Sequence, residues 1–190
     1  MKQFLILLIG FTFWCCGNQQ SSEQKPETPI NATESNTSGQ ATPVSANSAS
    51  EELTIYFPNL SSKTGDQVCV DVLVKGFEQL LSMQYTLAWN KAILKFREIK
   101  NFNLPYLDAA DFGQHRTADG FITAIWLDET LKGVSVPDAT SIYQICFDVI
   151  GKSGDNSFIK ITDRPTPTEV ANSREKLIPM KKENGSVKVE

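Results

Sequence analysis

Residue types that could carry catalysis are sparse in this chain. His115 is the only histidine among the 190 residues, so a Ser–His pair or a histidine metal site would depend on a single side chain. Serines are plentiful, but none lies in the Gly-x-Ser-x-Gly context of a nucleophile elbow. The sequence therefore predicts a protein that is not an enzyme.

Two pairs of acidic residues could hold a cation, Asp108 with Asp111 and Asp128 with Glu129. Calcium takes carboxylate and carbonyl oxygens from loops, but neither pair has the spacing of an EF-hand loop. Solvated loop charges are the simpler interpretation. We therefore predict no metal and no cofactor.

An apolar run from Phe4 to Trp14 ends in two adjacent cysteines, Cys15 and Cys16. The run follows Lys2 and is shorter than the roughly 20 residues that a membrane-spanning helix needs, so it is typical of an export signal. A cysteine directly after such a run resembles the lipid-attachment site of bacterial lipoproteins, where a peptidase cuts before the acylated cysteine. Cys16 is the better match because a small residue precedes it, and Cys15 is the alternative. The other interpretation is an ordinary secretory signal.

Residues 17–50 are polar and low in complexity, with Ile30 and Val44 as the only large apolar side chains. Such a segment cannot bury enough surface to offset the entropy that is lost on ordering. The sequence thus predicts a lipoprotein-type signal peptide at 1–16, a disordered linker at 17–50 and a folded domain at 51–190. A lipid anchor would place the exported domain at the outer membrane or the cell surface, or facing the periplasm.

Two stretches of the domain have the two-residue period of a half-buried strand. The apolar residues that share a face are Val68, Val70, Val72 and Val74 in the first stretch, and Met83, Tyr85, Leu87 and Trp89 in the second. Two apolar strand faces are most simply buried against each other. Further strands are expected at 53–57, 93–96, 112–117, 121–127, 141–150, 158–161 and 185–189, with a helical turn near 169–172. We expect an all-β fold, an eight- or nine-stranded β-sandwich with jelly-roll topology.

Three stretches in this order resemble the cohesin domain. Gly65–Val72 matches a Gly-Asp followed by alternating valines, and Met83–Phe96 matches an alternating strand that ends in Tyr-Asp-Pro, here replaced by Trp-Asn-Lys. Asn184–Val189 matches the terminal strand, and the resemblance covers Leu53–Val189. Cohesins are jelly-roll modules that grip the dockerin domains of enzymes in cellulose-degrading bacteria. The resemblance implies a binding module of this shape.

The resemblance also implies a partner-binding face on the strands around Met83–Asn90 and Phe121–Asp128. The residues expected to face outward there are Gln84, Thr86 and Asn90, with Asp128 at the strand end. An ordinary solvated sheet face has the same composition and is the alternative.

The cohesin-like arrangement further implies that the strands of Cys69 and Cys146 are neighbours in one sheet. Both cysteines belong to the outward faces of their strands, and exported proteins meet an oxidising compartment. We expect a disulfide between them, and two free thiols are the alternative.

The leading interpretation is a non-catalytic module, anchored at the cell envelope, that binds a protein partner, dockerin-like or other, or helps assemble a polysaccharide-degrading surface. A carbohydrate-binding module of related jelly-roll shape is the first alternative, although no single strand carries a row of exposed aromatic residues. A structural envelope lipoprotein is the second. The formal net charge of −4 with no basic block argues against nucleic acid as a partner.

Overall fold

The alternating valines form a strand with one buried face, as the sequence predicts, and this strand is the central one of a β-sheet. In the computed structural model, which describes residues 49–190, β3 (Gln67–Lys75) carries Val70, Val72 and Val74 with no exposed surface. The sheet has five strands in the order β11-β1-β3-β8-β5. Its other members are β1 (Leu53–Tyr56), β5 (Leu94–Lys100), β8 (Thr140–Val149) and β11 (Met180–Glu183).

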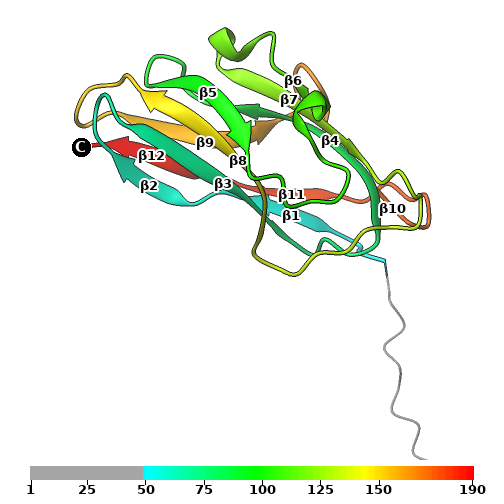
Figure 1. Cartoon of the computed structure of the whole chain (residues 1–190). Helices are drawn as coiled ribbons and strands as arrows, with labels where there is room; N and C mark the ends of the chain where they lie inside the picture. The colour runs from blue at the N-terminus through cyan, green and yellow to red at the C-terminus, as the bar shows by residue number, and fades with distance from the viewer. Residues whose placement is uncertain (1–48) are drawn as a thin grey trace, which may run out of the picture. The chain divides into compact units, whose positions relative to one another are not determined.

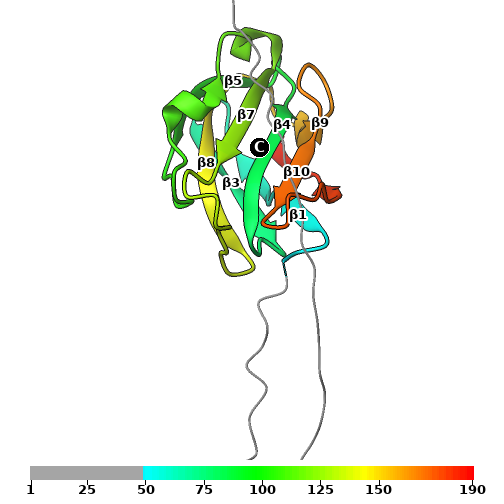
Figure 2. The same cartoon turned by 90° about the vertical axis from the view of Figure 1, so that its right-hand side faces the viewer.

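The second, seven-stranded sheet is built on β4 (Leu80–Ala88), whose alternate residues Met83, Tyr85 and Leu87 are buried. The strand order is β2-β12-β9-β4-β7-β6, and β10 pairs with the first half of β4. β9 and β12 lie side by side in Figure 1, and β4 and β10 do so in Figure 2. The other members are β2 (Asn59–Ser62), β6 (Phe112–Gly113), β7 (Phe121–Leu127), β9 (Asn156–Thr162), β10 (Glu169–Asn172) and β12 (Gly185–Val189).

The core lies between the inward faces of the two sheets. Tyr85 of β4 and Tyr143 of β8 are buried there, and their hydroxyl oxygens are 2.8 Å apart. Trp89 packs on Phe147 with ring centroids 5.0 Å apart. Aromatic side chains of this size dominate the apolar area that a small domain buries, so these contacts hold the two layers together.

Both end segments of the domain pass from one sheet to the other at the same place. β1 pairs in parallel with β11 in the first sheet, and β2 pairs in parallel with β12 in the second. The crossing brings Gly185, at the start of β12, against Phe57 and Pro58. A Cβ atom on Gly185 would lie 2.6 Å from the Cβ of Phe57, so the crossing requires glycine.

The predicted all-β sandwich is confirmed, but the described part has twelve strands where eight or nine were expected. The prediction of a helical turn at 169–172 is wrong, because this segment forms β10 and pairs with β4. The strand expected at 112–117 shortens to β6, since a 3₁₀ turn, η2 (Thr117–Asp119), begins before β7. A second such turn, η1 (Ala109–Asp111), precedes β6.

The chain enters the described domain beside β10, at the end opposite the C-terminus (Figure 1). Ser50 belongs to the predicted linker, yet it is buried and its carbonyl oxygen accepts a 3.1 Å hydrogen bond from the side chain of Asn172. Residues 1–48, with the predicted signal peptide, Cys15 and Cys16, lie outside the described residues. Within the described range, no helix is long and apolar enough to cross a membrane.

Candidate binding site

The two strands expected to form a binding face are neighbours in the seven-stranded sheet. β4 and β7 pair in antiparallel fashion, with Gln84 opposite Ile125 and Ser82 opposite Leu127. Gln84 is partly exposed on the outer face. Asn90 is exposed just beyond β4, where its side-chain oxygen accepts from the backbone N–H of Ala92. These two residues are accessible to a partner.

Thr86 is buried, contrary to its expected place on an exposed face. Its hydroxyl donates to the carbonyl oxygen of Thr166 and accepts from the N–H of the same residue, both at 3.0 Å. The loop between β9 and β10 therefore folds over Thr86 and divides the outer face in two. Lys182 of β11 holds this loop through a 2.6 Å hydrogen bond to Asp163, which lowers the pKa of Asp163 to about 2.

Asp128 is also buried, so its side chain is not accessible on the predicted binding face. Its carboxylate accepts hydrogen bonds from the backbone N–H groups of Thr130 (2.9 Å), Lys132 (3.0 Å) and Gly133 (2.8 Å), and from the hydroxyl of Thr130 (2.8 Å). Burial alone would raise the pKa of this carboxyl, but the hydrogen bonds outweigh burial and the pKa is lowered. Asp128 shapes the loop that follows β7.

An apolar trough lies on the outer face at the end of β4 that pairs with β10. Its floor is formed by two small residues, Ser82 of β4 and Ala171 of β10, which are direct neighbours across the strands. Leu127 is paired with Ser82 on one side, and Leu177 is paired with Ala171 on the other. The two leucines are 52% and 67% exposed, so they stand as walls on either side of the small residues. The trough has a volume of about 280 Å³.

The next row of residues closes one end of the trough with polar groups. Gln84 lies between Glu169 of β10 and Ile125 of β7, and Ile125 is 54% exposed. A contiguous apolar surface with a polar rim is typical of a protein-interaction site. Ile125, Leu127 and Leu177 are not among the site residues that the sequence predicts. The sequence contains a signal for Ile125 and Leu127, because residues 121–127 are apolar on both faces and a strand of a sandwich buries only one face.

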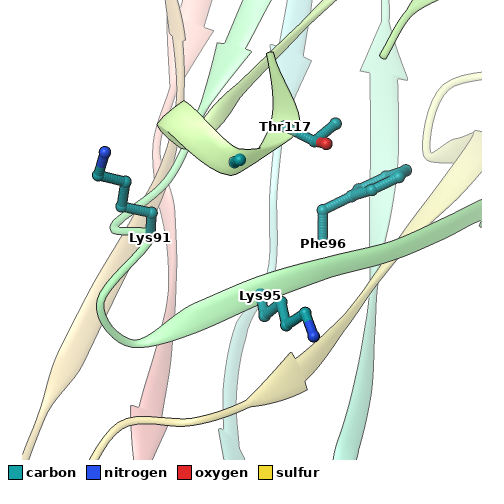
Figure 3. A pocket seen from close by; sticks show the side chains of 5 residues that line it. Lys91, Lys95, Phe96 and Thr117 are labelled. Atoms are coloured by element: carbon teal, nitrogen blue, oxygen red, sulfur yellow. The ribbon is translucent and has the colours of Figure 1, made fainter. Parts of the chain in front are cut away.

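A second concave site lies between β5 and η2, as Figure 3 shows. It has a volume of about 280 Å³ and is lined by Lys91, Lys95, Phe96, Thr117 and Ala118. In Figure 3, Phe96 and Thr117 lie near each other, whereas the side chains of Lys91 and Lys95 extend in different directions. Catalytic and ligand sites depend on converging polar groups, so this site does not favour a catalytic role.

Asp108 and Asp111 have a local structural role. The Asp108 carboxylate accepts from the N–H of Ala110, and Asp111 accepts from the N–H of Asp108, so the two cap η1. Of the residues that the structure describes, no group of three or more His, Cys, Asp and Glu side chains is placed to hold a metal ion. His115 is exposed.

Cys69 and Cys146 form a disulfide that joins β3 to β8 on the outer side of the five-stranded sheet. The two residues are directly opposite in the antiparallel register, with Cα atoms 4.0 Å apart. Cys146 has no exposed surface although it faces outward, because Cys69 lies on one side and Glu98 of β5 on the other. This covalent link is on the sheet opposite the trough.

A comparison with protein-family models found no match, and neither did a comparison with curated proteins. Solved cohesin structures share the fold. The type I cohesin–dockerin complex Coh-OlpA-Doc918 from Clostridium thermocellum matches with 18% identity and a TM-score of 0.60, over 73% of this chain and 99% of that chain.

Two further structures show the same likeness. The sixth cohesin of scaffoldin B from Acetivibrio cellulolyticus, solved with a mutant Cel5 dockerin, matches with 16% identity and a TM-score of 0.61, over 73% of this chain and 99% of that chain. A non-cellulosomal cohesin from the archaeon Archaeoglobus fulgidus matches with 16% identity and a TM-score of 0.56, over 73% of this chain and 91% of that chain. The described domain therefore has a cohesin-like fold, as its sequence motifs predict.

Proposed function

We propose that this chain is a non-catalytic module that binds a protein partner in the apolar trough. The observation that carries the proposal is the row Leu177–Ala171–Ser82–Leu127, in which two exposed leucines flank two small residues. Such a row leaves space for an apolar side chain between the leucines. Exposing them to water without a partner is unfavourable, at about 25 cal/mol for each Å² of apolar surface.

The chemistry of the partner follows from the trough and its rim. An apolar side chain fills the space between Leu127 and Leu177, and a donor group of the partner binds the exposed carboxylate of Glu169. The Clostridium thermocellum and Acetivibrio cellulolyticus cohesins that share the fold are complexed with dockerins, which supports a dockerin-like protein as the partner. Assembly of a polysaccharide-degrading surface is the corresponding biological role.

A binding experiment with matched variants tests the trough. The full chain, solubilised in mild detergent and immobilised, is exposed to purified dockerin domains and to a lysate of the producing cell. Leu127→Asp places a charge in the trough, and we expect it to abolish binding of the captured protein. Ile150→Asp is the control, because Ile150 is 49% exposed and lies outside the trough. Equal loss with both variants, or no loss with Leu127→Asp, contradicts the proposal.

We further propose that acylated Cys16 anchors the domain in the cell envelope, with the exported domain at the outer membrane or the cell surface. The apolar run that ends in Cys15 and Cys16 supports this placement. Labelled palmitate should enter the wild-type chain and not Cys16→Ala. Equal labelling of this variant contradicts the assignment to Cys16, and absence of label from both proteins contradicts the lipid anchor.

A further inference from the structure

An exposed aromatic ring lies on the outer face of the seven-stranded sheet, beyond the loop that covers Thr86. Phe158 of β9 is 59% exposed and lies directly opposite Ser186 of β12. Ser186 in turn lies opposite Asn59 of β2 and donates a 2.9 Å hydrogen bond to its side-chain oxygen. This bond does not use the amide N–H groups of Asn59. Phe158 thus has a hydroxyl and an amide beside it on a flat sheet surface.

A second aromatic residue shares this face. Ala88 of β4 lies opposite Phe121 of β7 on one side and opposite Lys160 of β9 on the other. With strands about 4.8 Å apart and a rise of about 3.3 Å per residue, Phe158 and Phe121 are separated by roughly 12 Å. Ala88, the last residue of β4, lies between their rows and has a small side chain, so an extended chain can cross from one ring to the other.

Basic groups lie beside both rings. Lys160 follows Phe158 on the same face of β9, and Lys188 of β12 lies opposite Asn156, on the other side of Phe158. Within residues 49–190, neither lysine is within ion-pair distance of a carboxylate. The guanidinium of Arg116 lies 4.5 Å from the ring centroid of Phe121.

Two carboxylates near these strands have other partners. Asp155, just before β9, accepts from the backbone N–H of Lys152 at 2.8 Å. Asp119 accepts from Arg116 at 2.9 Å and is 3.9 Å from Lys91. The ammonium groups of Lys160 and Lys188 are therefore available to an anionic ligand.

We propose that Phe158, Phe121, Lys160 and Lys188 form a binding surface for an acidic polysaccharide. The CH face of a sugar ring stacks on Phe158, and the next part of the glycan chain passes over Ala88 towards Phe121. The carboxylates or sulfates of the glycan pair with Lys160 and Lys188, while Asn59 and Ser186 bind its hydroxyl groups. Neutral glycans offer the same stacking face but no charge for the lysines.

This surface is distinct from the trough. The Thr86–Thr166 contact stands between the two, so one ligand can occupy each side. The inference goes beyond protein binding, because it gives the domain a second ligand of a different chemical class. It does not depend on the identity of the protein partner.

Retention of the full chain in detergent on immobilised polysaccharides tests the proposal. The probes are polygalacturonate as a carboxylate polymer, dextran sulfate as a sulfate polymer, and neutral xylan. We expect retention on at least one acidic polymer and not on xylan. Phe158→Ala should weaken retention roughly three- to tenfold, and Phe158→Tyr should preserve it. The double variant Lys160→Gln/Lys188→Gln should bind less and respond less to added salt.

Ile150→Ala is the matched control for an exposed apolar side chain and should be retained like the wild type. Retention on the carboxylate or the sulfate polymer alone supports the proposal and identifies the anion. Retention that is unchanged in Phe158→Ala overturns it, because plain ion exchange would then explain the binding. No retention on either acidic polymer, or equal retention on xylan, also overturns it.

Discussion

The hydroxyl groups of Tyr85 and Tyr143 are hydrogen-bonded to each other across the two sheets, with 2.8 Å between the oxygens. Both side chains are buried. Burial raises the pKa of both phenols, so both stay protonated in the folded protein. Each hydroxyl therefore depends on the other for a partner in the middle of the core.

We expect Tyr85→Phe to destabilise the domain by about 1–3 kcal/mol, because it leaves the Tyr143 hydroxyl buried without a partner. The double variant Tyr85→Phe/Tyr143→Phe should be more stable than either single variant, since no unpaired hydroxyl remains. Urea unfolding measures the difference. Tyr106→Phe, at an exposed position, is the control and should have no effect. If the losses of stability in the two single variants add up in the double variant, an unpaired hydroxyl group is not the cause of these losses.

Gly185→Ala should destabilise the domain by about 1–3 kcal/mol or more, because its Cβ would overlap Phe57 where β11 crosses to β12. Gly154→Ala is the comparison: its φ is +92° but no atom lies within 4 Å of the added Cβ, so its cost is limited to about 1–2 kcal/mol of backbone conformation. Thermal unfolding of the two variants shows which of them loses more stability. A larger loss in Gly154→Ala contradicts a steric requirement at the crossing.

The Asp128 carboxylate should make the domain sensitive to acid. Its folded-state pKa is lowered below the unfolded value of about 3.9, so its stabilising effect is complete above that pH and is lost as the pH falls through the folded-state pKa. Asp128→Asn should be less stable near pH 7 and should lose less stability on acidification than the wild type. Urea unfolding between neutral and acidic pH measures both slopes. Parallel curves for the two proteins rule out this role for Asp128.

Replacing both cysteines of the disulfide should lower stability on the order of 4 kcal/mol, because the bond closes a loop with a sequence separation of 77 residues. Cys69→Ala/Cys146→Ala is compared with the wild type under non-reducing conditions. Mass spectrometry of the thiol-blocked wild type checks that the bond is present. Alkylation of both cysteines in freshly prepared, exported protein contradicts the pairing.

Period-two alternation was sufficient to predict the buried face of β3 and the inward residues of β4. A strand has the same alternation whatever its neighbours are, so this information is local. It also placed Cys69 and Cys146 on outward faces, and the cohesin resemblance supplied their adjacency. The short polar strands β2, β10 and β11 carry too few apolar residues to show a period, and they form because their backbones pair with β12, β4 and β1.

To predict the candidate sites, one would need the pairing register of strands that are distant in the sequence. Thr86 looks like any outward residue of β4, and it is buried only because residue 166 folds back over it. Leu127 and Leu177 become walls of one trough because Ser82 and Ala171 pair between them. In the same way, Phe158 and Phe121 share a face only through the pairing of β9, β4 and β7.

The hydrogen bond between Ser50 and Asn172 affects how mechanical force enters the domain. Beside that bond, Glu51 lies 3.9 Å from Arg174 and 3.3 Å from Lys176, in the turn that leads to Leu177. A pull on the N-terminal segment therefore reaches β10 and its turn, which form one side of the trough, through these contacts. The backbone carries the same pull into β1, which begins at Leu53, so the load is shared between the edge of the trough and the five-stranded sheet.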